Sequence, residues 1–239
     1  MKKLNTIEEC VLDVNFETDA ILESFFSPIS LVDNFSEILK LPLSQIPESV
    51  RKSDPNLKYQ PIYEIRSKTD TEYKILLGTN SIGISLNNTG EYSSWSESFF
   101  PEAKRLFSEI FKSNKIIKIE RIGLRYIDFI IDSNIFKDEK IVVKIDKEDA
   151  EDKKMFLRIE GDIDGVSYIK TLSNHIKYKE DKNKGSIVDI VTFIDKKGEI
   201  INDDFNKDRF FEELNSLHLV HTKKFKEVIN DKSIREYGI

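Results

Sequence analysis

The sequence predicts an α+β fold, in which mostly antiparallel strands form one or more curved sheets packed against long helices. Three observations predict it. Segments that alternate apolar and polar residues are joined by connections too short for crossover helices, so neighbouring strands run antiparallel. Three stretches repeat apolar residues at helical intervals, and the last is a long helix near the C-terminus. With 39% hydrophobic residues, a chain of 239 residues has enough apolar side chains for a sizeable core.

The N-terminal part predicts a strand followed by a helical region. Residues 9–17 alternate as a half-buried strand does. Its inward positions are Cys10, Leu12, Val14 and Phe16. From Asp19 the apolar period becomes helical, which predicts a helical region as far as Lys40 that is broken or kinked at Pro28. Further prolines then mark a connecting segment.

The middle of the chain predicts a three-stranded meander, a helix and a second strand. The meander strands are Tyr59–Arg66, Tyr73–Leu77 and Ser81–Leu86. A turn at residues 68–71 joins the first two, and residues 87–90 end the third. The helix spans Ser96–Ser113 with one apolar stripe, and the strand spans Ile116–Ile131.

The second half predicts four more strands and the last helix. The strands are Lys140–Ile145, Met155–Ile163, Val166–Tyr178 and Ser186–Ile194. Asp164-Gly165 predicts a hairpin between the second and third, and residues 195–198 end the sheet. The helix spans Asn206–Asn230. Residues 1–239 form either a single α+β unit or two lobes, 1–134 and 139–239, and the pattern fits both.

The strand that begins at Ile116 is the best indication of a site, because Arg121 and Arg125 share one of its faces with Gly123 between them. Both faces are otherwise largely apolar, which predicts a central strand covered on each side. A buried guanidinium needs an anionic partner. Either each arginine pairs with a carboxylate of an adjacent strand, or one or both bind an anionic group of a ligand or partner. The candidate carboxylates are Glu9, Asp13, Glu160 and Asp162.

Tyr126 and Asp128 lie on the opposite face of the same strand and offer a phenol and a carboxylate. We expect them to hydrogen-bond to a sheet edge or loop. Together with Arg121 and Arg125 they are the candidate ligand- or partner-binding residues. The sequence indicates no catalytic residues and no cofactor.

Two other groups of residues have the right chemistry for metal ions. His218 and His221 are three positions apart on a predicted helix, but a zinc site needs at least one further ligand. Glu160, Asp162 and Asp164 alternate along a strand, a pattern that can hold a divalent cation for phosphodiester cleavage. We interpret the histidines as packing or surface residues, and a metal-dependent nuclease stays an alternative for the acidic strand.

The composition bounds the partners and the compartment. There are 43 acidic against 37 basic residues, a net charge of −6, which argues against a broad nucleic-acid interface. The single cysteine, Cys10, fits a reducing compartment. An apolar run of about 18 residues, which a membrane-spanning helix requires, is missing. We therefore expect a cytoplasmic protein without a membrane partner.

Several segments resemble a sporadically distributed family of uncharacterised bacterial proteins marked by an R-x-G-L-R-Y-(I/V)-(N/D) strand. They are residues 7–16, the spacing of Trp95 and Phe99, the octapeptide 121–128, and residues 225–229 and 235–238. The chain departs from the family before its first strand, where the family often has Pro-Pro-Ile, and just before Trp95. Patchy distribution implies mobile gene cassettes, which commonly encode defence against phage or control of toxins. The resemblance implies no established activity or cofactor.

The leading hypothesis is therefore a non-enzymatic protein that binds a protein partner from the same gene cassette. It would be the sensor, adaptor or neutralising component of a bacterial defence or toxin–antitoxin cassette. One alternative is a module that binds a small anionic ligand through Arg121 and Arg125. The other is the metal-dependent nuclease.

Overall fold

A computed structural model describes residues 6–32, 35–67, 72–87, 92–145, 148–149, 153–177, 184–200 and 207–230. The strands are β1 Ile7–Glu17, β2 Phe35–Lys40, β3 Pro61–Ser67, β4 Tyr73–Gly78, β5 Ser81–Asn87, β6 Lys118–Ile131, β7 Lys144–Ile145, β8 Glu148–Asp149, β9 Phe156–Ile163, β10 Val166–Lys177 and β11 Lys184–Ile200. The helices are η1 Leu22–Phe25, α1 Phe26–Ser30, η2 Pro42–Gln45, α2 Glu48–Ser53, η3 Trp95–Phe99, α3 Phe100–Lys112 and α4 Lys207–Lys226.

These elements form two compact units, each assembled from separate parts of the chain. In the described part of the chain, unit 1 takes residues from 6–9, 125–192 and 216–230, and unit 2 takes residues from 10–124 and 193–215. Strands β1, β6 and β11 and helix α4 each contribute residues to both units. These boundaries differ from the two lobes that the sequence allowed, 1–134 and 139–239.

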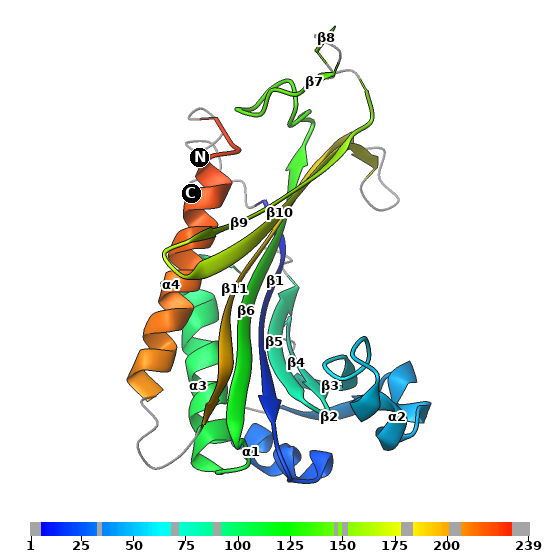
Figure 1. Ribbon diagram of the computed structural model, residues 1–239, viewed down its shortest axis with the longest axis vertical. Coiled ribbons are helices and arrows are strands. Elements are labelled where there is room, and N and C mark those ends of the chain that lie inside the picture. The colour runs from blue at the N-terminus through cyan, green and yellow to red at the C-terminus, as the bar shows by residue number, and fades with distance from the viewer. Residues whose placement is uncertain are drawn as a thin grey trace. The chain divides into compact units, whose positions relative to one another are not determined.

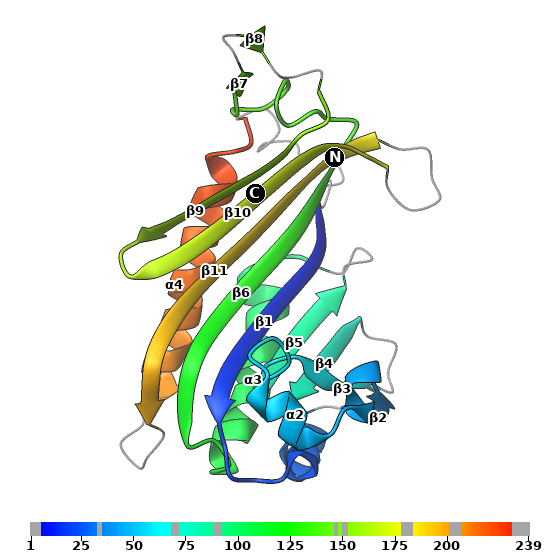
Figure 2. The same ribbon diagram turned by 45° about the vertical axis from the view of Figure 1, so that its right-hand side comes forward.

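In unit 2 the strands lie in the order β2-β3-β4-β5-β1-β6-β11 (Figure 2). The pairs β3–β4 and β4–β5 are antiparallel, which confirms the predicted meander, and β2 adds a further antiparallel pair with β3. The inward positions of β1 are also confirmed, since all four are fully buried: Cys10, Leu12, Val14 and Phe16.

Strand β2 corrects the prediction of a helical region as far as Lys40. The helical part ends with α1 at Ser30, and Phe35–Lys40 is a strand paired with β3. The spacing of Leu31, Phe35, Ile38 and Leu39 fits a helix, but over so short a run it does not distinguish the two periods. Pairing with β3 decides the conformation, because tertiary context overrides a weak local preference.

Helix α3 covers part of this sheet with the apolar stripe that its sequence predicts (Figures 1 and 2). The predicted stripe is fully buried and consists of Phe99, Ala103, Leu106, Phe107 and Ile110, and Phe111 is nearly buried as well. The ring of Phe210, from the first turn of α4, lies 5.4 Å from that of Phe107 and 4.9 Å from that of Phe111. A π-helical turn opens this helical segment at Trp95, whose indole N–H donates to Asn215 Oδ1 at 2.8 Å.

In unit 1 the neighbouring strands are β1, β6, β11, β10 and β9, in this order. Strands β9 and β10 form the predicted antiparallel hairpin, with Ile163 opposite Val166. Asp164 and Gly165 form its two-residue turn with φ angles of 50° and 81°, as a type I′ turn requires. The end of α4 contributes to the apolar core of this unit. That core contains Ile130, Ile135, Phe136, Leu172, Val188, Ile190, Phe225, Val228 and Ile229.

The α+β class, the mostly antiparallel sheet and the C-terminal helix are thus confirmed, but the helices are not long. Helix α4 has 20 residues and α3 has 13, whereas the other described helices have at most six. Of the predicted strand Lys140–Ile145, only Lys144–Ile145 is extended, and it pairs with β8. The predicted end of the sheet at residues 195–198 is wrong, because β11 continues to Ile200.

Some predictions fall on residues that the structure does not describe. They are the turn at residues 68–71, most of the turn at 87–90, and the motif residues 235–238. None of the helices in the described ranges has the length and apolar content needed to cross a membrane.

Candidate functional site

Arg125 is held by a carboxylate of the neighbouring strand. Its Nε donates to Asp189 Oδ1 at 2.9 Å and its Nη2 donates to Asp189 Oδ2 at 2.7 Å, so β6 and β11 share a bidentate ion pair in unit 1. The hydrogen bonds to Asp189 raise the pKa of Arg125. The arginine side chain is 44% exposed, and an exposed pair of this kind contributes about 1 kcal/mol at most.

Arg121 has a different environment, in unit 2. Its guanidinium carbon lies 4.0 Å from the centroid of the Phe193 ring, a cation–π contact. Its Nε is buried and has no hydrogen-bond partner among the described residues. Burial raises the pKa of Asp13 to about 6, and attraction to Arg121 opposes that rise. Asp13 is therefore the carboxylate that offsets the charge of Arg121.

Gly123 makes room for this carboxylate. A Cβ atom placed on Gly123 would lie 2.8 Å from Asp13 Oδ1, closer than such atoms approach in proteins. The glycine between the two arginines is thus explained by the close approach of a side chain from β1, and the space beside it is occupied.

The two faces of β6 differ in coverage, which corrects the expectation of a strand covered on both sides. Ile122 and Leu124 are completely buried on one face. On the face of the arginines, Arg125 is 44% exposed and Ile131 is 39% exposed. The arginine face of this strand is therefore partly open to solvent in unit 1.

Tyr126, on the covered face, packs against two histidines of α4 in unit 1. Its hydroxyl lies 3.3 Å from His218 Nδ1, and its ring stacks on that of His221 at 4.2 Å between centroids. Burial lowers the pKa of His218 to about 4 and that of His221 to about 3, so both imidazoles are neutral at pH 7. The sequence indicated that these histidines share a helix side, and the structure shows that they use it for packing.

Asp128 is almost completely buried, with 2% of its surface exposed. The hydroxyl of Thr6 donates to its Oδ1 at 2.8 Å, while Oδ2 has no partner in the described ranges. The pKa of Asp128 is raised to about 7, chiefly by burial and to a smaller extent by the carboxylates of Glu8 and Asp189, while the hydrogen bond from Thr6 opposes the rise. This carboxyl therefore changes its charge close to neutral pH, and its ionisation lowers the stability of the folded protein.

The acidic strand β9 does not bring its carboxylates together. Glu160 accepts a hydrogen bond from Arg158 Nε at 2.7 Å, and Asp162 accepts one from the hydroxyl of Ser167. Within the residues that can be described, no three His, Cys, Asp or Glu side chains are grouped so that they could hold a metal ion.

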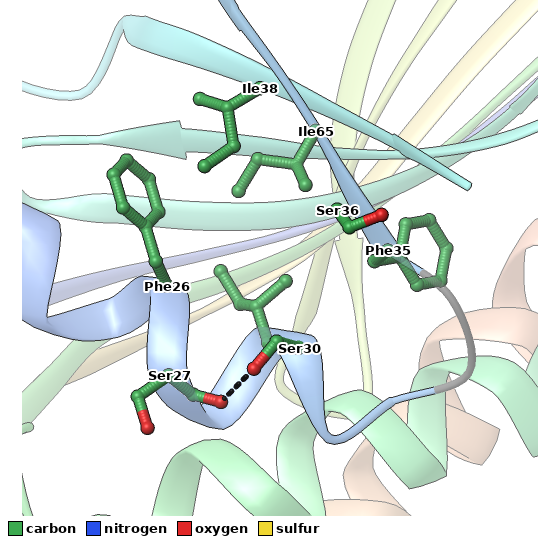
Figure 3. A pocket seen from close by; sticks show the side chains of 8 residues that line it. Phe26, Ser27, Ser30, Phe35, Ser36, Ile38 and Ile65 are labelled. Carbon is green, nitrogen blue, oxygen red and sulfur yellow. Dashed lines mark hydrogen bonds between the residues drawn. The ribbon is translucent and has the colours of Figure 1, made fainter. Parts of the chain in front are cut away.

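The sequence did not reveal an apolar pocket in unit 2, which we call the α1–β2 pocket. It has a volume of about 330 Å³ and lies beside the edge of the sheet (Figure 3). Its lining consists of Phe26, Ser27, Ile29, Ser30, Phe35, Ser36, Ile38 and Ile65. The available signal was the run of large apolar residues between Ile21 and Leu39, which the sequence analysis interpreted as a broken or kinked helical region.

A second pocket of about 450 Å³ also belongs to unit 2. Leu31 and Val32 line one part of it, and α3 supplies the rest. The residues from α3 are Pro101, Lys104, Arg105, Ser108 and Glu109. Its lining is thus partly charged, in contrast to that of the α1–β2 pocket.

Comparisons with protein-family models, with curated proteins and with solved structures found no match for this chain.

Proposed function

We propose that this protein binds a partner protein through an apolar surface of unit 2. The observation that supports the proposal is the distribution of exposed apolar side chains. Of the nine large hydrophobic residues that are exposed in the described part of the chain, four fall within residues 21–50. They are Ile21, Leu31, Ile38 and Val50.

Exposed apolar groups concentrated in one segment favour an interaction surface, because leaving them in water forgoes about 25 cal/mol for each Å² that a partner would cover. Two of the four also line concave surface. Leu31 lines the second pocket and Ile38 lines the α1–β2 pocket. Pockets beside exposed apolar residues are where interfaces place their anchor side chains.

The arginine strand offers less support for the anionic-ligand alternative. Asp189 already occupies two donors of Arg125, so an anionic ligand would have to displace a bidentate carboxylate. Arg121 contacts Phe193 and is balanced by Asp13. Both arginines fit the first reading of the sequence, in which they pair with carboxylates of adjacent strands.

We further propose that the partner is encoded in the same gene cassette, and that the protein is a sensor, adaptor or neutralising component in bacterial defence or toxin control. The resemblance of the octapeptide 121–128 to a sporadically distributed bacterial family supports this part of the proposal. A cytoplasmic location belongs to the same proposal, because such partners meet in the cytoplasm.

Co-expression with the products of adjacent genes, followed by affinity purification, tests the proposal. We expect one product to co-purify with the wild-type protein. Leu31→Asn removes apolar surface from the proposed interface and should lower recovery of the partner at least tenfold. Leu219→Asn is the matched control, because Leu219 lies in α4 and is 67% exposed against 70% for Leu31. The proposal fails if no product binds, or if both variants bind as the wild type does.

A further inference from the structure

Strand β2 forms one edge of the sheet in unit 2. It pairs with β3 from Phe35 opposite Ser67 to Lys40 opposite Tyr63, and no other described strand lies on its other side. An edge strand directs every second backbone N–H and C=O away from its neighbour. The outer side of β2 is therefore a row of hydrogen-bonding groups suited to an added strand.

Strand β9, which forms the edge of the sheet in unit 1, shows how an edge is protected against added strands. Its exposed side carries Phe156 and then three charged residues at alternating positions, Arg158, Glu160 and Asp162, and charges of this kind disfavour pairing. In β2 the exposed residues are Ser36, Glu37, Ile38 and Lys40, so that the exposed apolar side chain of Ile38 lies between two charged positions. Strand β2 has fewer exposed charged residues than β9, and its exposed apolar side chain lines a pocket.

The α1–β2 pocket lies directly beside this edge. Ile38 of β2 and Ile65 of β3 are opposite each other in the register, and both side chains line the pocket together with Phe26 from α1 (Figure 3). The only polar side chains in the lining are three serines, and one of them, Ser30, donates to the carbonyl of Ser27 at 2.7 Å. A pocket without ionisable groups favours an uncharged apolar occupant.

We infer that β2 and the α1–β2 pocket together recognise an extended segment of the partner, which adds a strand to the sheet and inserts a large apolar side chain into the pocket. The inference rests on the proposed function and specifies the kind of segment that the partner presents. Because alternate side chains of a strand point to the same face, the segment carries large apolar residues at every second position.

Selection from a display library of linear nine-residue peptides against the purified wild-type protein tests the inference. The enriched sequences should share large apolar residues at alternate positions. One enriched peptide, labelled with a fluorophore, then reports affinity by fluorescence anisotropy. Two versions of it are N-methylated at odd or at even backbone positions. An added strand loses binding in only one of the two, because only alternate amides face β2.

Two serine variants separate the pocket from the rest of the surface. Ser30→Leu fills the pocket and should weaken peptide binding at least tenfold. Ser53→Leu is the matched control, since Ser53 is also exposed at the end of a short helix and bonds to the carbonyl three residues before it, but it lines neither pocket described above. Thermal unfolding of both variants checks that they fold.

The inference is overturned if no peptide is enriched, if Ser30→Leu binds the peptide as the wild type does, or if both methylated peptides still bind. Its failure differs from failure of the proposed function. If the cassette partner binds Ser30→Leu normally but Leu31→Asn poorly, partner binding stands and the added strand is wrong. If the partner binds neither the wild type nor any variant, both are wrong.

Discussion

Replacing Asp128 by asparagine tests the account of the buried face of β6. The substitution keeps the size of the side chain and an oxygen that accepts the hydrogen bond from Thr6, but it removes the charge. In the folded protein, burial raises the pKa of Asp128 from 3.8 to about 7. In the unfolded chain the carboxyl is solvated and has its ordinary pKa.

The sign of the effect follows from which state binds the proton more tightly. Because the folded-state pKa is the higher one, the contribution of Asp128 to stability is fully present below pH 4 and is lost as the pH rises to about 7. A pKa difference of about three corresponds to about 4 kcal/mol. The asparagine variant has no such loss. Its free energy of unfolding relative to the wild type should therefore rise by about 4 kcal/mol between pH 4 and pH 8.

Urea unfolding followed by circular dichroism at several pH values between 4 and 8 measures this difference. Thr6→Val provides a second check, since removing the hydroxyl that donates to ionised Asp128 raises the folded-state pKa and should extend the window of stability loss to higher pH. A difference between Asp128→Asn and the wild type that does not change with pH would refute the reasoning, because it would show that the carboxyl has its ordinary pKa in the folded protein.

Three further predictions concern the neighbouring groups. Burial lowers the pKa of His221 to about 3, so the wild type loses stability as the pH falls below 6.5. The free energy of unfolding of His221→Phe, measured with urea, should therefore rise by about 2 to 3 kcal/mol relative to that of the wild type from pH 6.5 to 4.5. The same pH dependence in both proteins would contradict this. Because the Arg125 side chain is 44% exposed, a double-mutant cycle on Arg125 and Asp189 should give a coupling energy of about 0.5 to 1 kcal/mol that falls in 1 M NaCl. A coupling energy above about 3 kcal/mol would contradict this, because it would mean that the ion pair is shielded from water. Gly123→Ala should destabilise the protein by about 1 to 3 kcal/mol in chemical unfolding, and most of that cost should vanish in an Asp13→Ala background. An equal cost in both backgrounds would show that the added methyl group does not clash with Asp13.

Strong local patterns made parts of the fold predictable from sequence. The alternation in residues 9–17 identified the inward side chains of β1, and Asp164-Gly165 identified the hairpin of β9 and β10. In both cases the local signal and the tertiary structure favour the same conformation. The apolar stripe of α3 is a third example, because its residues repeat over several turns of helix.

Strand β2 was not predictable because its signal is short and ambiguous. Phe35 and Ile38 fit a helical stripe as well as a strand, and only pairing with β3 distinguishes the two. The α1–β2 pocket depends on that pairing, since it is lined by α1, β2 and β3. A binding surface assembled from three elements leaves no motif in a single segment.

The candidate site was predictable only in part. The sequence identified β6 as the strand with two constrained arginines, and it included Asp13 among the possible partners. It did not include Asp189, because the neighbour of β6 on that side is β11, far along the chain. Nor did it reveal which face of β6 is the better covered one. The side chains that cover Tyr126 on that face are histidines of α4, which is distant from β6 in the sequence.

Hydrogen–deuterium exchange tests the proposed partner binding most directly. The protein is measured alone and in complex with the gene-cassette product that co-purifies with it. The account predicts slower exchange on binding in residues 26–40, which contain α1 and β2, and little change in β9. Slower exchange confined to unit 1, with residues 26–40 unchanged, would contradict it.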